Sequence, residues 1–210
     1  MKSVVIRQLG LQAYLPTWQA MRDFTEQRNV TSPDEIWLVE HPAIFTLGQN
    51  GQTQHILNAG DIPIVKIDRG GQVTYHGPGQ LMVYVLADLR AHGIGIRSLV
   101  TYLEQSIVAL LSELGIPSYT RCDAPGVYVN NAKICSIGLR IRHWCSYHGM
   151  ALNVAMDLSP FTRIHPCGYQ GLMMTQVKDW LPNISMAQII PLLLKHLIQH
   201  MAYNNVLNGE

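Results

Sequence analysis

The sequence has no excess of charge of either sign. Its 210 residues include 15 lysines and arginines against 14 aspartates and glutamates, a net charge of +1 with histidine neutral. A nucleic-acid-binding surface needs a basic face, so this balance argues against nucleic acid as a partner. No apolar run approaches the ~20 residues of a membrane span, and the apolar stretch near Met1 is too short for a secretory signal. We therefore expect a cytoplasmic protein that is not inserted in a membrane.

Several signatures of bound groups and of multiple domains are also missing. The four cysteines, at positions 122, 135, 145 and 167, show no C-x-x-C spacing, so neither a zinc site nor a disulfide framework is indicated. No GxxxxGK[ST] phosphate loop is present. There is no internal repeat, low-complexity tract or linker rich in proline and serine. Because 48% of the residues are apolar, we predict a globular chain and treat residues 1–210 as a single domain.

The spacing of apolar residues predicts more strands than helices. Strands are predicted over residues 4–9, 35–40, 43–47, 64–68, 81–86, 127–129, 133–142 and 146–156, and helices over 16–28, 97–114 and 185–201. Ser185 and Gln188 have the spacing of a capping box, and Pro191 is expected to kink the last helix or delay its start. Because the strands do not alternate regularly with helices, the pattern favours an α+β fold over a doubly wound sheet.

A predicted hairpin contains the first candidate catalytic residue. Asn tolerates the left-handed backbone of tight turns, so Asn130 and Asn131 are expected to connect strands 127–129 and 133–142. Strict alternation puts Lys133 on the apolar face of the second strand, with Cys135. Partial desolvation there would lower the pKa of Lys133 and allow it to act as a base. The alternative is a strand-end lysine whose amine reaches water.

Cys167 is the second candidate. It lies between Pro166 and Gly168, so the backbone is restricted on one side and permissive on the other. Such a loop presents the side chain and is expected to leave the following N–H groups free for an oxyanion. By contrast, Cys135 and Cys145 fall inside apolar strands, where a thiol is usually a small buried hydrophobe. Cys122 lies in a turn and could be exposed or packed.

Four motifs in this order resemble one known family. They are RGGQVTYHGPGQ at 69–80, DAPGVYV with AKICSIGLRI at 123–141, CSYHGMALNV at 145–154 and LSPFTRIHPCGYQG at 158–171. Together they resemble the lipoyl(octanoyl) transferases, the octanoyl-[acyl-carrier-protein]:protein N-octanoyltransferases. The similarity covers nearly the whole chain, from residue 5 to about residue 180.

The resemblance implies a fold, an activity and a set of site residues. The fold is that of biotin and lipoate protein ligases, a mostly antiparallel sheet flanked by helices. The cysteine at the position of Cys167 carries an acyl thioester in this family, and the lysine at the position of Lys133 activates it. The acyl pocket is expected to be lined by Arg69, Gly70, Gly71, Gln72, Val73, Thr74, Tyr75, His76, Ser136, Ile137, Gly138, Gly149, Met150 and Ala151.

The resemblance also decides how the glycines and histidines are interpreted. The glycines near Arg69 allow a ligand such as a phosphate to approach the backbone closely. The alternative is that they only form turns. His76 and His148 could each be the base of a Cys/His pair; given the resemblance, they are assigned to shaping and hydrogen bonding. His41, His55, His143 and the C-terminal histidines are expected on the surface.

The implied donor is octanoyl-acyl carrier protein. The implied acceptors are lipoyl domains of 2-oxoacid dehydrogenase complexes and the glycine cleavage H protein, and neither a cofactor nor a metal is expected. Arg140 and Arg142 point the same way from one strand and could dock the acidic carrier, or form an ordinary solvated face. Two other functions are kept open: an ATP-consuming lipoate or octanoate ligase on the same fold, and a non-catalytic module that binds the carrier protein.

Overall fold

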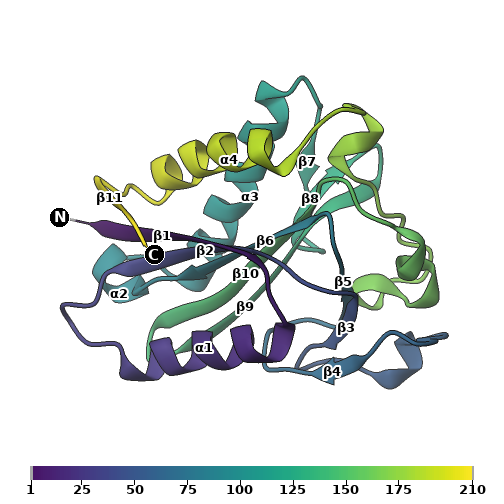
Figure 1. Ribbon diagram of the computed structural model, residues 1–210, viewed down its shortest axis with the longest axis horizontal. Coiled ribbons are helices and arrows are strands. Elements are labelled where there is room, and N and C mark those ends of the chain that lie inside the picture. Colours follow the sequence, from purple (N-terminus) through teal and green to yellow (C-terminus); the bar gives the residue numbers. More distant parts are fainter. Residues whose placement is uncertain (1, 210) are drawn as a thin grey trace.

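An eight-stranded sheet forms the frame of the molecule (Figure 1). The structure is a computed structural model and describes residues 2–209. In spatial order the strands are β11 (Asn205–Asn208), β1 (Ser3–Leu11), β2 (Asp34–Glu40), β6 (Gln80–Leu86), β10 (Cys145–Asn153), β9 (Ala132–Arg142), β8 (Gly126–Val129) and β7 (Tyr119–Thr120). A second sheet has the order β4 (Ile64–Lys66), β3 (Ile44–Leu47) and β5 (Val73–His76).

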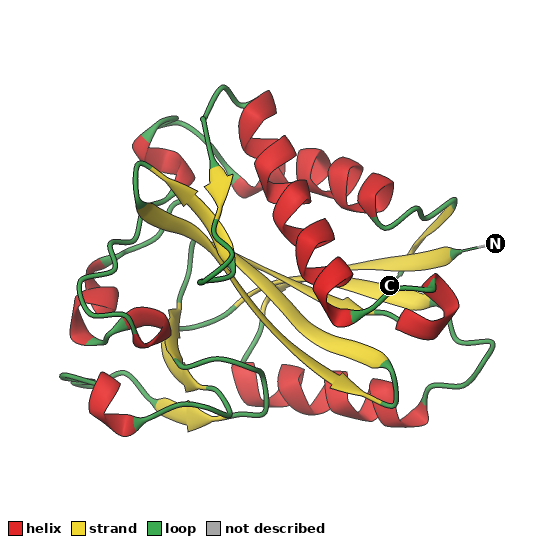
Figure 2. Cartoon of the chain, turned by 180° about the vertical axis from the view of Figure 1, so that it is seen from behind, coloured by secondary structure: helices red, strands yellow, loops and turns green. Residues whose placement is uncertain are grey.

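Helices cover both faces of the large sheet, as Figures 1 and 2 show from opposite sides. The α-helices are α1 (Tyr14–Gln27), α2 (Leu89–His92), α3 (Ile96–Glu113) and α4 (Met186–His200), and the 3-10 turns are η1 (Thr53–His55), η2 (Ser159–Arg163), η3 (Pro166–Gly168) and η4 (Val177–Asp179). The main core lies between the sheet and α3 with α4, where Leu103 and Leu193 are fully buried. On the opposite face, Met21 of α1 packs with Trp37 and Tyr84.

The α+β class and the mostly antiparallel sheet are confirmed. The antiparallel pairs are β2–β6, β6–β10, β10–β9, β9–β8, β8–β7 and β3–β5. The pairs β1–β2, β1–β11 and β3–β4 are parallel. The parallel β1–β2 pair follows from α1, which crosses from the end of one strand to the start of the next.

The hairpin turn is also confirmed. Asn130 and Asn131 have φ angles of 47° and 66°, the left-handed pair that a two-residue hairpin connection requires. This turn brings Lys133 back beside Tyr128 of β8.

Several local predictions need correction. Residues 73–76, treated only as part of a glycine-bracketed segment, form strand β5, and α2, β7 and β11 were not predicted. Helix α4 has the predicted Ser185–Gln188 capping box. It begins at Met186 and includes Pro191, so the proline does not delay its start. The N–H of Ser185 donates to Gln188 Oε1 at 3.0 Å, and this capping bond supports a helix start before the proline. None of the helices within residues 2–209 is long and apolar enough to cross a membrane.

Gly149 provides a test of the sheet packing. A Cβ atom at this position would lie 2.0 Å from the carbonyl oxygen of Val83 on β6, so Gly149→Ala must push two central strands apart. We expect a loss of more than about 1 kcal/mol in the free energy of unfolding, measured by urea denaturation. In Gly70→Ala the added atom meets only an ordinary 3.5 Å contact. Equal stabilities of the two variants would contradict this account.

Candidate active site

Cys167 is presented by a strained turn. It is the middle residue of η3 and has a φ of 57°, a left-handed conformation that is uncommon for a residue other than glycine. Such strain at a candidate nucleophile is typical of functional loops. The expected free donors after the cysteine are not found, because the N–H of Gly168 donates to His165 and that of Tyr169 donates to Pro166. Any oxyanion donors must therefore come from other groups.

Lys133 reaches Cys167 from the start of β9. Its side chain is almost fully buried, at 1% exposure. Its Nζ donates to the Cys167 Sγ at 3.4 Å and to the carbonyl oxygen of Pro125 at 3.0 Å, and it lies 5.2 Å from the centre of the Tyr128 ring. The buried amine therefore has an acceptor, a thiol and an aromatic face around it, and it does not extend to water.

A β-bulge decides which way Lys133 points. Val127 and Tyr128 of β8 are consecutive, yet they pair with Cys135 and Lys133 of β9, so Ile134 is an extra residue. The alternation reverses there. Ile134 and Cys135 both enter the main core, whereas Lys133 and Ser136 both line a cavity. The prediction that Lys133 shares the face of Cys135 is therefore wrong, although the prediction that it is desolvated is right.

The charge state of Lys133 also differs from expectation. Burial lowers the pKa of its ammonium, but the charges of Cys167 and Tyr128 raise it, and the net result is a pKa above the ordinary lysine value. The expected decrease in the pKa of Lys133 is wrong in sign, because that expectation took account of burial but not of the neighbouring Cys167 and Tyr128. Lys133 is therefore a protonated cation beside the sulfur at neutral pH.

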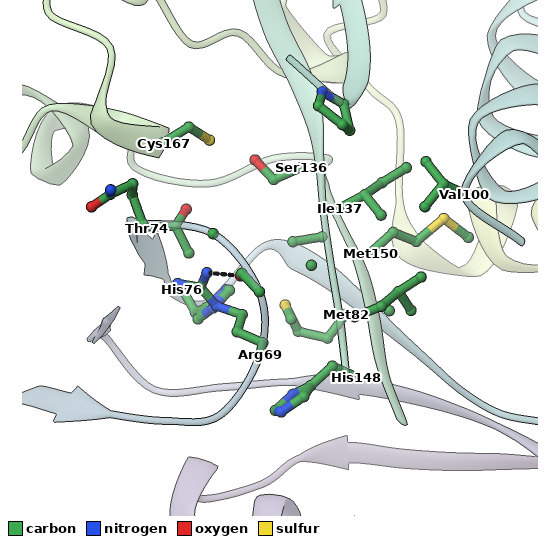
Figure 3. Close-up of a pocket in the computed structure, with 18 of the residues that line it drawn as sticks. Arg69, Thr74, His76, Met82, Val100, Ser136, Ile137, His148, Met150 and Cys167 are labelled. Atoms are coloured by element: carbon green, nitrogen blue, oxygen red, sulfur yellow. Dashed lines mark hydrogen bonds between the residues drawn. The ribbon is translucent and has the colours of Figure 1, made fainter. Parts of the chain in front are cut away.

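A cavity of about 380 Å³ extends from these two residues along the sheet (Figure 3). In Figure 3, Cys167 and Ser136 lie at one end, and Met82 and His148 at the other. Besides Cys167 and Lys133, the predicted residues that line it are Arg69, Gly70, Gly71, Gln72, Val73, Thr74, His76, Ser136, Ile137, Gly138, Gly149, Met150 and Ala151. A mostly apolar space of this size, with a thiol in its wall, suits a medium-length acyl chain.

One predicted residue lies elsewhere, and several lining residues were not predicted. Tyr75 is not among the lining residues; its ring packs against Phe45 and Phe161. Additional walls come from Tyr14, Met82, Tyr84, Ile96, Val100, Ala124, Pro125, Leu139, His148 and Tyr169. Alternation along β6 places Met82 and Tyr84 on one face, which was an available signal. Tyr14 and Val100 come from helices, and only the packing brings them to the cavity.

The histidines near the cavity are neutral. Burial, together with the charge of the nearby Arg69, lowers the pKa of His76 to about 3. Burial also lowers the pKa of His148, although its Nε2 lies 3.0 Å from Asp68. His41, expected at the surface, is fully buried, with its ring nitrogens bonded to the Gln12 carbonyl and the Tyr84 hydroxyl. The sequence could not show this, because both partners are distant along the chain.

The other cysteines are unsuited to nucleophilic chemistry or lie elsewhere. Burial raises the pKa of Cys135 to about 12 and also raises that of Cys145; both are buried as predicted, and Cys122 is exposed. Of the proposed docking residues, Arg142 forms an ion pair with Glu26, and Arg140 donates to Gln49 at 2.7 Å. Within residues 2–209, no three His, Cys, Asp or Glu side chains are grouped so that they could hold a metal ion.

The fold is that of the lipoate protein ligases and their relatives. A bipartite lipoate protein ligase of Thermoplasma acidophilum matches the structure with a TM-score of 0.79, over 100% of this chain and 88% of the other, at 13% sequence identity. This likeness confirms the fold implied by the sequence motifs.

Sequence comparison identifies the family. Residues 13–198 match the lipoyl protein ligase A/B catalytic domain family. The octanoyltransferase of Photorhabdus laumondii is 54% identical, over 96% of this chain and 95% of the relative. The octanoyltransferase of Pseudomonas fluorescens is 56% identical, over 94% and 92% respectively. The chain belongs to the lipoyl protein ligase A/B family, among its octanoyltransferases.

The buried neutral histidines predict how stability depends on pH. The folded pKa of His76 is about 3, below the unfolded value of about 6.5, so the unfolded chain binds more protons between these values. Stability is therefore fully present above about pH 6.5 and falls as the pH drops toward 3, with a slope of up to about 1.4 kcal/mol per pH unit for this group. Urea titrations from pH 7 to pH 4.5 should show a shallower loss for His76→Gln than for the native protein. Parallel curves would show that His76 does not contribute to the slope.

Proposed function

We propose that this protein transfers an octanoyl group from octanoyl-acyl carrier protein to a lysine of a lipoyl domain, through a thioester on Cys167. The observation that carries the proposal is the 3.4 Å contact between Lys133 Nζ and Cys167 Sγ at one end of a cavity of about 380 Å³. The octanoyltransferases that are more than half identical over nearly the whole chain support the choice of acyl group.

The first half-reaction moves the acyl group onto the protein. The thiolate is the nucleophilic form of cysteine, and the Lys133 ammonium lies 3.4 Å from the Cys167 sulfur. The thiolate attacks the thioester carbonyl, the bond from that carbon to the carrier's sulfur breaks, and Lys133 gives its proton to the departing sulfur. The alkyl chain lies in the cavity, away from water. One thioester replaces another, so this step is close to neutral in free energy.

The second half-reaction moves the acyl group to the acceptor. The amine of the acceptor lysine attacks the thioester on Cys167, a carbon–nitrogen bond forms, and the bond to sulfur breaks. The neutral Lys133 left by the first step takes the proton that the amine loses, which restores the ammonium beside the thiolate. Amide formation from a thioester is downhill, so the cycle needs no further activation. A covalent intermediate of this kind predicts ping-pong kinetics.

The proposed partners follow from the two substrates. We propose lipoyl domains of 2-oxoacid dehydrogenase complexes and the glycine cleavage H protein as acceptors, with Arg140 and Arg142 beside the path of an acidic donor. The related archaeal ligase was studied with its E2 lipoyl domain, which supports an acceptor of this type. Residues 1–210 are proposed to act as one catalytic domain in the cytoplasm.

A ligase is the alternative favoured by the fold, because another neighbour is a lipoate-protein ligase A bound with ATP, at a TM-score of 0.77 and 13% identity. A ligase must activate a free acid with a nucleotide, whereas an acyl thioester is already activated.

Intact mass measurement separates the candidate functions. Incubation with octanoyl-carrier protein alone, without nucleotide or divalent metal, should add one octanoyl group to the native protein. Cys167→Ala should gain none, whereas Cys135→Ala should gain it as the native protein does, because that thiol lies in the core. Dependence on ATP with release of AMP would support the ligase, and a native protein that never gains mass would support a binding module.

Substitution of Lys133 tests the proton-transfer role. Lys133→Met fills a similar volume and removes a buried cation, so the protein should remain folded. We expect the single-turnover acylation rate to fall by ~10²–10⁴-fold, the usual contribution of a positioned proton-transfer group. Acylation at the native rate would mean that Lys133 has only a structural role.

A further inference from the structure

The backbone of Lys133 is held by a segment that follows the Cys167 loop. The N–H of Lys133 donates to the carbonyl of Met173 at 2.8 Å, and the N–H of Thr175 donates to the carbonyl of Lys133 at 3.0 Å. Residues 173–175, here called the clamp segment, thus run parallel to β9 at this one point. Strand β10 pairs with β9 only as far as Cys135, and the clamp segment takes the next position.

This arrangement links the two candidate catalytic residues through the backbone. The clamp segment begins six residues after Cys167, so one end of the Cys167 loop is attached to the strand residue that carries the Lys133 side chain. The other end is attached where His165 donates its N–H to the carbonyl of His55 at 2.8 Å. A shift of the clamp segment would therefore change the separation of Lys133 and Cys167.

A buried amide holds the clamp segment in place. Asn153, the last residue of β10, is 1% exposed. Its Nδ2 donates to the carbonyl oxygen of Thr175 at 2.9 Å, and its Oδ1 accepts from Gln80 Nε2 at 2.9 Å. A flipped amide would place oxygen against oxygen and N–H against N–H, so the two partners determine its orientation.

The partner of Asn153 is itself fixed by buried hydrogen bonds. Gln80 Oε1 accepts from His76 Nδ1 at 2.8 Å, and His76 Nε2 accepts from Thr46 Oγ1 at 3.1 Å. Arg69 Nη2 donates to the same Thr46 oxygen at 2.9 Å. All these side chains are less than a tenth exposed, so a continuous polar network runs from Arg69 in the cavity wall to Asn153.

We propose that Asn153 is a positioning residue, which sets the separation of Lys133 and Cys167 by holding the clamp segment. Asn153 does not line the acyl cavity, so it acts without touching the substrate. The inference rests on the proposed function. It adds a residue, outside the Cys/Lys pair, that also determines the reaction rate. Because the reacting groups must meet within a fraction of an ångström of the productive geometry, loosening the clamp affects the rate far more than binding.

Two variants of Asn153 test the proposal. Asn153→Ala removes the amide, and Asn153→Leu replaces it with an apolar group of similar size. We expect single-turnover acylation by a small octanoyl thioester to slow by ~10–100-fold, with KM for the thioester within about twofold of native. Hydrogen exchange at the Thr175 amide should become faster, because its local support is lost.

Ser146→Ala is the matched control, since Ser146 lies on the same strand, is fully buried and donates to Val85 at 2.7 Å. It should acylate at the native rate. A folded Asn153 variant within about threefold of the native rate would overturn the proposal. A decrease in rate matched by an equal weakening of KM would also overturn the proposal. So would failure of both Asn153 variants to fold while Ser146→Ala folds, because Asn153 would then contribute only to general stability. A native protein that gains no acyl group refutes the proposed function instead, and amide exchange still shows whether Asn153 holds the clamp.

Discussion

Burial of the Lys133 amine is the constraint on which the surrounding structure depends. A lysine cation removed from water is unfavourable unless charge and hydrogen bonds replace its hydration. Here the replacements are the Pro125 carbonyl, the Cys167 sulfur and the ring of Tyr128. Gly126 leaves room for the Lys133 side chain, because a Cβ atom at this position would lie 3.0 Å from Lys133 Cε and 2.5 Å from the Cys135 carbonyl oxygen. The bulge at Ile134, the turn that carries Cys167 and the Pro125–Gly126 pair where β8 begins therefore all accommodate one buried charge.

The molecule separates its apolar and polar interiors. The core between the sheet and α3 with α4 is made of aliphatic side chains such as Leu103 and Leu193. The small sheet and the ends of β6 and β10 contain buried histidine, glutamine and asparagine side chains, which are satisfied by one another. Apolar burial supplies most of the stability of a fold, whereas a fully satisfied polar network fixes the positions of its members. The active site lies beside the polar part, so the residues that must be placed most accurately have directional contacts.

Most of the fold could be predicted from the sequence, because its signals are local. The apolar stripe of α3, the Asn130–Asn131 turn and the alternation of the central strands each depend on neighbouring residues. Strand β5 was concealed by the glycines around it, and the parallel pairing of β1 with β11 joins segments that are far apart in the sequence. Cys167 and Lys133 could be chosen from the loop and hairpin together with the family resemblance. The bulge that turns Lys133 toward the cavity, the charge that raises its pKa and the burial of His41 arise from contacts between distant residues, and the local pattern does not contain them.

The division between scaffold and loop explains how one fold can hold both ligases and transferases. The cavity is lined mainly by β5, β6, β9 and β10 together with residues 69–72, and β6, β9 and β10 are held by the central sheet pairings. Cys167, the proposed nucleophile, instead lies on a 3-10 turn with a left-handed φ, a conformation that costs of order 1–3 kcal/mol and persists only when its surroundings impose it. The hydrogen bonds on either side of this turn come from the clamp segment and from the His55–His165 contact. The type of reaction can therefore change when the loop beside the cavity changes, while the strands that line the cavity stay the same. In such a fold the rigid strands determine which ligand binds, and the loop determines which reaction follows.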